Sequence, residues 1–210
     1  MPDGSVILSS RTSGRVFNIY KYSDVKSGTG KWLGAVTSNS SNSGIAVGNS
    51  TNGEIMLVKA IRKSDNQPVT LALQSVPFAN SRANVGIFYK EIPASAYNNV
   101  TALASNWTKG LQVSKLGSAY STMTLQHDFR IGFLFEEEPG GYSIVYLPLT
   151  IEDITFGNYA LNKDEYITGI TTNEVYPTTA TGVYYDLQGR RAPQPRQGLY
   201  IVDGKKVLIK

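Results

Sequence analysis

Short runs in which apolar and polar residues alternate recur along the chain, and turn-forming stretches separate them. A period of two predicts strands with one buried face. The runs "GSVILSS" and "RVFNIYKYS" predict a hairpin joined through "RTSG", and "EIMLVKAIR" and "PVTLALQSV" predict a second joined through "KSDNQ". "NVGIFYK" follows as a further strand, and "YSTMTLQ", "RIGFLFEEE" and "YSIVYLPL" predict a third meander.

Helical periodicity is nearly absent between these strands. Residues 93–109 are mostly polar and predict a loop with room for one short helix. Strands that follow one another at spacings of roughly ten residues, without helices between them, predict an all-β fold. Meandering hairpins of this kind fit the four-stranded blades of a β-propeller.

The stretch "YSDVKSGTGKW", from Tyr22 to Trp32, predicts a specific hairpin turn. An aspartate can accept hydrogen bonds from the turn backbone, glycine adopts positive φ, and an aromatic ring packs at the edge of the sheet. The stretch resembles a degenerate Asp-box, which is the turn motif of sialidase-type propellers. Its role is structural, so Asp24 and Trp32 receive no catalytic role.

The character of the chain changes after Tyr166. We expect residues 1–165 to form the main β domain, the threonine-rich residues 166–182 to form a linker, and residues 183–210 to form a small β tail of three short strands. The "DG" near the end predicts a type I′ hairpin. The motifs "YDLQGRR" and "GLYIVDGKKVLIK" resemble the C-terminal sorting tails of secreted Bacteroidetes proteins, which the type IX secretion machinery reads. A simple anchor module is the alternative.

Composition excludes several classes of function. The 210 residues are 41% hydrophobic and 17% charged, which is typical of a globular protein. The net charge of +4 is modest and basic residues gather only from Arg190 to Lys210, so we expect no nucleic-acid partner. The chain has no cysteine, which excludes disulfides, thiol catalysis and zinc–thiolate sites. Its single histidine, His127, is predicted to lie in a hairpin turn. The chain therefore lacks the residues for serine–histidine, cysteine–histidine or multi-histidine metal mechanisms.

The ends of the chain and its apolar runs bear on localisation. No apolar run is long enough to cross a bilayer. The start, "MPDGSVILSS", has neither the basic region nor the apolar region of a signal peptide and looks like the middle of a domain. We therefore expect Met1 to be an artificial or truncated beginning.

Three chemically distinctive residues stand at predicted strand ends. Arg11 closes one strand, Arg82 precedes another, and Tyr120 opens a third. In a propeller such strand ends can converge near the central axis, where two arginines and a tyrosine form an anion-binding pocket that contains a hydroxyl group. From the residues alone the alternatives stay open: Arg11 as a turn residue, Arg82 as a loop charge and Tyr120 as a core aromatic.

These segments, in their order, resemble the second half of a bacterial exo-α-sialidase (neuraminidase) with a six-bladed propeller. "PDG…L.SR" matches the motif of the second arginine that binds the substrate carboxylate, "R.N.GIFY" that of the third, and "AYSTM" with "IGFLFEEE" that of the catalytic tyrosine. The resemblance covers about Pro2 to Tyr159. It implies about three of six blades, substrate binding by Arg11 and Arg82, and catalysis by Tyr120.

The chemistry of sialic acid explains these residue types. Guanidinium groups form bidentate, charge-assisted hydrogen bonds to its carboxylate and stay charged at any working pH. A carboxylate nucleophile would be repelled by that anion, whereas a phenol is neutral until it reacts. Glycosidases with a tyrosine nucleophile are a known exception to the two-carboxylate scheme. A phenol with a pKa near 10 needs a base and nearby cations to react.

The chain departs from the family's pattern in its catalytic partners. The resemblance places the glutamate base just before Met1, and the first arginine and the acid/base aspartate still earlier. Glu136, Glu137 and Glu138 are expected to form a solvated strand end and turn, and Tyr146, the runner-up nucleophile, is expected on a packed strand. We therefore expect a catalytically incomplete part of a sialidase.

The resemblance implies sialylated glycans as partners, no metal, no cofactor and no membrane span. It also implies a parent protein that is secreted, periplasmic or at the cell surface. The alternatives are a non-catalytic sialic-acid-binding module, which would bind without turnover, and a surface structural module without a ligand.

Overall fold

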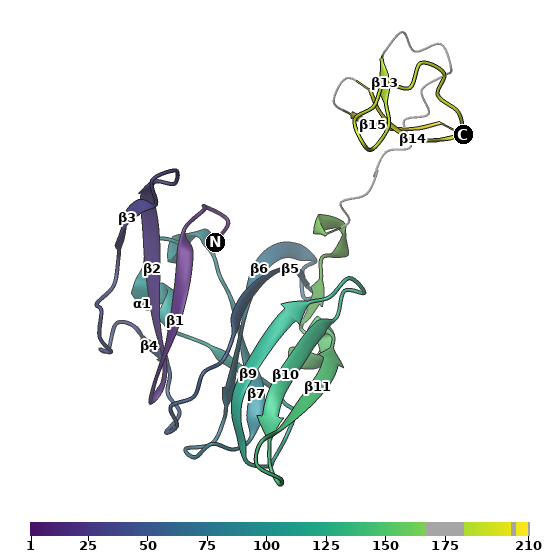
Figure 1. The fold of residues 1–210 in the computed structure, drawn as a ribbon. Helices are drawn as coiled ribbons and strands as arrows, with labels where there is room; N and C mark the ends of the chain where they lie inside the picture. The colour runs from purple at the N-terminus through teal and green to yellow at the C-terminus, as the bar shows by residue number, and fades with distance from the viewer. Residues whose placement is uncertain (167–182, 203–204, 210) are drawn as a thin grey trace. The chain divides into compact units, whose positions relative to one another are not determined.

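The computed structural model describes residues 1–166, 183–202 and 205–209. The predicted all-β class is confirmed, because the described residues are 48% strand and 8% helix. It divides into two compact units, Met1–Lys163 and Asp164–Lys210, and each is described by itself (Figure 1).

The first sheet holds the strand that carries Arg11. Its order is β1 (Val6–Thr12), β2 (Gly14–Asp24) and β3 (Thr29–Trp32), and β4 (Ser43–Ile45) also pairs with β2. The expected first hairpin is confirmed, with Thr12 paired to Gly14 across a very tight turn. Gly14 has φ +94°, and a Cβ there would lie 1.8 Å from the Ile45 carbonyl oxygen. Only glycine fits at this position.

The central sheet has the order β12 (Tyr159–Leu161), β5 (Ile55–Arg62), β6 (Gln67–Pro77), β7 (Val85–Glu91) and β8 (Thr108–Gln112). The second predicted hairpin is confirmed as β5 and β6, and "NVGIFYK" as β7. The predicted loop at residues 93–109 contains η1 (Ala94–Ala96) and α1 (Val100–Ala104), as expected, but it also contains the start of β8. The sequence "TKGLQ" has little alternation of its own, and β8 forms by pairing with the free edge of β7.

The third sheet is the predicted meander of β9 (Ser118–Leu125), β10 (Ile131–Glu137) and β11 (Ser143–Leu149), in the order β11-β10-β9. After β11 the chain turns into the short helix α2 (Ile151–Ile154). Thr150 and Asp153 form a reciprocal capping box that fixes the start of α2. A further short helix, η2 (Lys163–Glu165), follows β12.

The three sheets of this unit pack face to face, with the central sheet between the other two (Figure 1). Phe17 and Ile19 of β2 share a core with Ala72 and Val76 of β6 and with Leu103 of α1. Across the other face, β9 contacts β6. The outward faces of the first and third sheets carry large apolar side chains that stay exposed, among them Val6, Leu8, Trp32, Leu134, Ile144 and Tyr146.

The second unit contains β13 (Tyr184–Tyr185), β14 (Gly198–Val202) and β15 (Lys205–Ile209) in one antiparallel sheet. The three predicted strands are therefore confirmed. Tyr184, Val202 and Val207 form a small core of their own. The "DG" turn at residues 203–204 and the expected linker, apart from Tyr166, lie outside the described residues. Within the described ranges, no helix is long and apolar enough to cross a membrane.

A charged turn at the start of the chain fixes β1 against β2. The Asp3 carboxylate accepts hydrogen bonds from the Ser5 amide (3.1 Å) and hydroxyl (2.6 Å), and it pairs with the Lys21 ammonium at 2.6 Å. Burial acts to raise the pKa of Asp3, but the hydrogen bonds from Lys21 and Ser5 outweigh it and lower the pKa to about 2.

Because the folded-state pKa of Asp3 lies below its unfolded value, its ionised form stabilises the fold above about pH 4 and loses that effect as the pH falls toward 2. We expect Asp3→Asn to lower the free energy of unfolding by about 1–2 kcal/mol at pH 7, and the difference from wild type to shrink toward pH 2. Urea unfolding followed at several pH values measures this. An equal loss at pH 7 and at pH 2.5 would contradict the role given to the carboxylate.

Candidate functional site

Arg11, Arg82 and Tyr120 come from three separate segments and lie together in the structure. Arg11 is near the end of β1, Arg82 is in the loop between β6 and β7, and Tyr120 is near the start of β9. The Arg11 Nη1 group donates a long hydrogen bond of 3.4 Å to the Tyr120 hydroxyl oxygen. The Arg82 Cζ atom lies 5.5 Å from the centroid of the Tyr120 ring, within the range of a cation–π contact. All three side chains are exposed to solvent.

The loop that carries Arg82 is tied to the beginning of β9. The Arg82 carbonyl accepts a 2.8 Å hydrogen bond from the Ser118 amide, and Ala83 forms a β-bridge with Gly117. The Arg82 Nη2 group donates to the Ser50 carbonyl at 3.4 Å. These backbone contacts explain why a residue that is 38 positions away in sequence stands over the Tyr120 ring.

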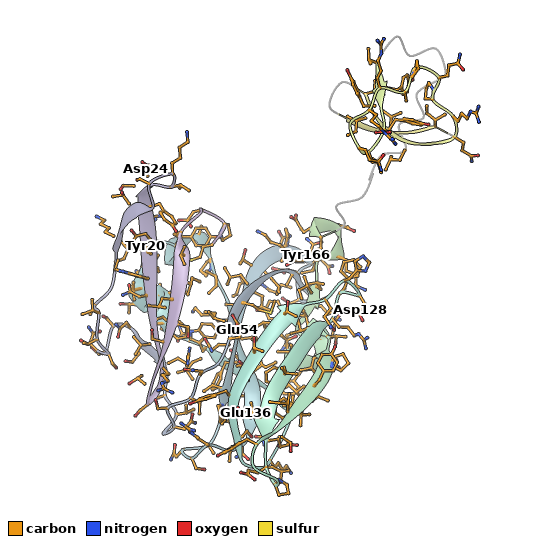
Figure 2. All side chains as sticks on the ribbon, viewed as in Figure 1. Tyr20, Asp24, Glu54, Asp128, Glu136 and Tyr166 are labelled. Atoms are coloured by element: carbon orange, nitrogen blue, oxygen red, sulfur yellow. The ribbon has the colours of Figure 1, made fainter. Side chains whose placement is uncertain are left out.

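Tyr120 occupies an irregular position in its strand. The register of β9 and β10 shifts between Phe135 and Glu137, where β9 has one residue more than β10. Such a bulge bends the strand and changes the direction of a side chain. At this point the Tyr120 amide donates to the Glu136 carboxylate at 3.0 Å. Figure 2 shows Glu136 near the lower end of the third sheet. The bulge and this hydrogen bond fix the backbone from which the phenol projects.

The two arginines make the Tyr120 phenol more acidic than an ordinary tyrosine. The hydrogen bond from Arg11 and the positive charges of Arg82 and Arg11 lower the pKa of Tyr120 below its usual value of 10.0. Cations beside a phenol favour the phenolate and therefore activate it as a nucleophile.

We expect Arg11→Ala to raise the pKa of Tyr120, because the variant loses the main hydrogen bond and one of two charges. NMR titration of ¹³Cζ-labelled tyrosines measures this, with the Tyr120 signal assigned from a Tyr120→Phe variant. Arg130→Ala is the matched control, since Arg130 pairs with Asp128 at the opposite end of the third sheet from Glu136 (Figure 2). Equal Tyr120 titration curves in wild type and Arg11→Ala would contradict the contact.

Arg15 belongs to the support of this site and was not singled out from the sequence. Its side chain is only 3% exposed. It donates to the Ser9 carbonyl (2.7 Å) and hydroxyl (2.9 Å) and to the carbonyls of Thr51 (2.9 Å) and Gly53 (3.5 Å). Burial lowers the pKa of Arg15 to about 10, and the charge of Glu54 acts in the opposite direction. A signal was present, because Arg15 shares the core-facing side of β2 with Phe17.

The segment between β4 and β5 (residues 46–54) is held by Arg15 and in turn contacts the site. The carbonyl of Ser50 accepts from Arg82, and the Glu54 carboxylate accepts from Thr122 of β9 at 3.1 Å. Glu54 is labelled near the middle of Figure 2, where the central sheet meets β9. This segment therefore links the support of Arg82 with the strand of Tyr120.

The three glutamates at the end of β10 and in the following turn lie where they were expected. Glu136 and Glu137 end β10, and the Glu138 carboxylate accepts from the amides of Gly140 (3.1 Å) and Gly141 (3.3 Å) in the turn that follows.

The remaining candidates behave as follows. His127 lies in the β9–β10 turn, which confirms its predicted place. Tyr146 lies on β11 as predicted, but the expectation of a packed side chain is wrong. It is 49% exposed and its hydroxyl donates to Gln126 at 2.7 Å, because it faces outward on an edge strand.

The stretch from Tyr22 to Trp32 forms the predicted hairpin turn between β2 and β3, and Figure 2 shows Asp24 at its tip. The Asp24 carboxylate accepts from the Lys26 amide at 2.9 Å and from the Ser27 hydroxyl at 2.8 Å. Trp32 packs edgewise on Tyr20, with ring centroids 5.0 Å apart. These contacts hold the turn together.

Among the residues that the structure describes, no group of three or more histidine, cysteine, aspartate or glutamate side chains is placed to hold a metal ion. Comparison with known proteins found no protein-family model and no curated protein that matches the chain.

Proposed function

We propose that this chain is part of a retaining exo-α-sialidase, an enzyme that removes terminal sialic acids from glycoconjugates, and that its three packed sheets are propeller blades. The observation that supports this best is that Arg11 and Arg82 both contact Tyr120. Arg11 and Tyr120 are 109 positions apart in sequence. In the part of the chain described, no carboxylate forms an ion pair with Arg11 or Arg82, so both guanidinium groups are free to bind the carboxylate of an anionic sugar. Tyr120 lies beside them and supplies a hydroxyl group.

Each residue has a defined task in this proposal. Arg11 and Arg82 bind the substrate carboxylate through charge-assisted hydrogen bonds. Tyr120 attacks the anomeric carbon through its phenolic oxygen and gives its proton to the general base, while the glycosidic C–O bond breaks and the aglycone leaves with a proton from the acid/base aspartate. Water, deprotonated by the same aspartate, then hydrolyses the glycosyl–tyrosine bond, which releases sialic acid and restores the phenol. The two cations favour the phenolate, so the same pair of arginines serves binding and catalysis.

The general base and the acid/base aspartate of this mechanism come from parts of the parent enzyme that this chain does not contain. Glu136 is not given the role of the base in this proposal; its carboxylate accepts the Tyr120 backbone amide and helps to fix the strand from which the phenol projects. We therefore expect binding of sialic acid without turnover by the chain alone. The parent is secreted, periplasmic or at the cell surface, and residues 183–210 act as its sorting tail.

The test is saturation-transfer NMR of the chain with N-acetylneuraminic acid. We expect saturable binding that Arg82→Ala weakens by about tenfold or more, since a charge-assisted hydrogen bond contributes about 1.5–3 kcal/mol. Arg130→Ala is the control for loss of one exposed positive charge, and circular dichroism checks that each variant is folded.

Two results would count against the proposal. Unchanged affinity in Arg82→Ala would show that the arginine does not bind the carboxylate. No binding by the folded wild-type chain would favour a structural module. Release of product from a sialylated reporter by this chain would overturn the expected lack of turnover.

A further inference from the structure

A cavity lies at the end of β5 that is farther from Arg11, Arg82 and Tyr120. β5 starts next to Glu54, near the first site, and its eight residues end at Arg62, which lines the cavity. At about 3.4 Å per residue, the two places are about 25 Å apart along the strand. The cavity measures about 460 Å³, within the range of about 300–1,000 Å³ that is typical of small-molecule sites. Residues from β5, β7, β8 and the segment before β12 line it.

Two tyrosine rings form the apolar part of this cavity. Tyr89 and Tyr159 lie edge to face, with centroids 5.9 Å apart and planes at 70°. Tyr89 is only 7% exposed, so its ring is fixed by packing. Rings of this kind offer an apolar surface and a polar hydroxyl at once, which suits the C–H face and the hydroxyl groups of a sugar ring.

The polar groups of the cavity are held in place by one another. The Arg62 guanidinium donates two hydrogen bonds to the Glu91 carboxylate (3.0 and 2.7 Å) and one to Asp65 (2.6 Å). The Tyr159 hydroxyl donates to the same Glu91 carboxylate at 3.4 Å, and the Asn158 amide donates to the Tyr89 hydroxyl at 3.3 Å. Groups that are fixed before a ligand arrives lose little conformational entropy on binding.

The charge balance of this cavity differs from that at Tyr120. Two carboxylates neutralise Arg62, whereas no carboxylate pairs with Arg11 or Arg82 in the part of the chain that the structure describes. Lys63 adds one exposed ammonium group. The Arg62 guanidinium is already paired with Glu91 and Asp65, so it is not free to bind the carboxylate of an acidic sugar. An uncharged polyol can exchange hydrogen bonds with Asn158 and the other neutral lining groups.

From these features we propose that the cavity binds one uncharged sugar residue of the hexose or N-acetylhexosamine class. The inference goes beyond the proposed function and does not depend on it, because it uses neither Tyr120 nor the two arginines around it. A second sugar contact about 25 Å from the first would hold the protein on a branched or clustered glycan, since two linked weak contacts bind more tightly than either one.

The experiment is a ¹H–¹⁵N NMR titration of the full chain with the methyl glycosides of galactose and of N-acetylglucosamine. We expect at least one of them to cause saturable shifts at the amides of residues 62–64, 108 and 157–159. Asn158→Ala and Thr108→Val should each weaken this binding fivefold or more. Thr108 is exposed, so its variant tests the cavity even where Asn158→Ala disturbs the fold.

Controls separate this site from the first. Arg82→Ala should leave the affinity for the neutral sugar unchanged, and N-acetylneuraminic acid should shift amides around Arg82 and Tyr120 instead. The proposal is overturned if neither glycoside gives saturable shifts at the cavity. Equal shifts with glycerol at the same concentration would overturn the assignment of a sugar ring, and wild-type affinity in both variants would overturn the location.

Discussion

Phe17→Ala is expected to lower the free energy of unfolding by about 3–5 kcal/mol, the usual cost of removing a fully buried aromatic ring. Phe17 is 0% exposed and its ring stacks on Trp107 at a centroid distance of 4.9 Å and an interplanar angle of 11°. It belongs to the core that joins the first sheet to the central sheet. The variant therefore loses apolar burial and leaves a cavity at the junction that positions β1 and Arg11.

Chemical denaturation followed by circular dichroism measures this loss without relying on Trp107 fluorescence. Val25→Ala is the control, because Val25 is 74% exposed in a turn and its truncation should change stability by less than about 0.5 kcal/mol. A Phe17→Ala variant within 1 kcal/mol of wild type would show that the two sheets do not depend on this contact, because the range expected for such a truncation is about 3–5 kcal/mol.

Arg15→Leu is expected to lower the free energy of unfolding by about 2–4 kcal/mol. Leucine fills part of the volume but leaves the partly buried carbonyl of Ser9 and the buried carbonyl of Thr51 without the donors that Arg15 provides at 2.7 and 2.9 Å. Each buried polar group without a partner costs about 1–3 kcal/mol. Arg15→Lys should recover only part of this, because an ammonium group cannot reproduce the planar fork of donors.

The same substitution should affect the site through the segment at residues 46–54. Its Ser50 carbonyl accepts from Arg82, so loosening the segment should weaken binding of N-acetylneuraminic acid even though Arg15 does not face the ligand. Urea unfolding gives the stability and saturation-transfer NMR gives the affinity. Arg130→Leu, which removes an exposed ion pair, should change stability little and leave binding unchanged. Equal stability of the Arg15→Leu and Arg130→Leu variants would refute the supporting role.

The strands could be predicted because their alternation is strong. In β10 the buried Phe133 and Phe135 flank the exposed Leu134. β8 could not be predicted, because "TKGLQ" depends on the free edge of β7 and not on its own pattern. The local sequence shows the hydrophobic period of a strand and the residues of its turns. Whether a segment pairs with the edge of a sheet depends on a partner strand elsewhere in the chain.

For the candidate site, the residue types could be predicted but their support could not. Arg11, Arg82 and Tyr120 stood out as polar groups at strand ends, and the structure brings them together. The buried Arg15 went unnoticed because an arginine next to a turn is usually a surface charge, although its place on the same face of β2 as Phe17 was a signal. Its partners are backbone carbonyls, which have no signature in the sequence.

The contact between Tyr120 and Glu136 was also beyond prediction, since it depends on a one-residue irregularity in the pairing of β9 with β10. A period-two reading assumes a regular ladder, and a bulge changes the face on which every later residue stands.

That irregularity has a consequence for how homologous chains should be compared. A relative that lacks the extra residue near the start of β9 can retain a tyrosine in the same alignment column and still present its hydroxyl on the opposite side of the sheet. Conversely, a tyrosine shifted by one column can be the true counterpart of Tyr120 when the insertion lies on its other side. Alignments of this segment should therefore score the insertion together with the tyrosine, because a gap placed there changes the side of the sheet on which the phenol stands as much as a substitution would.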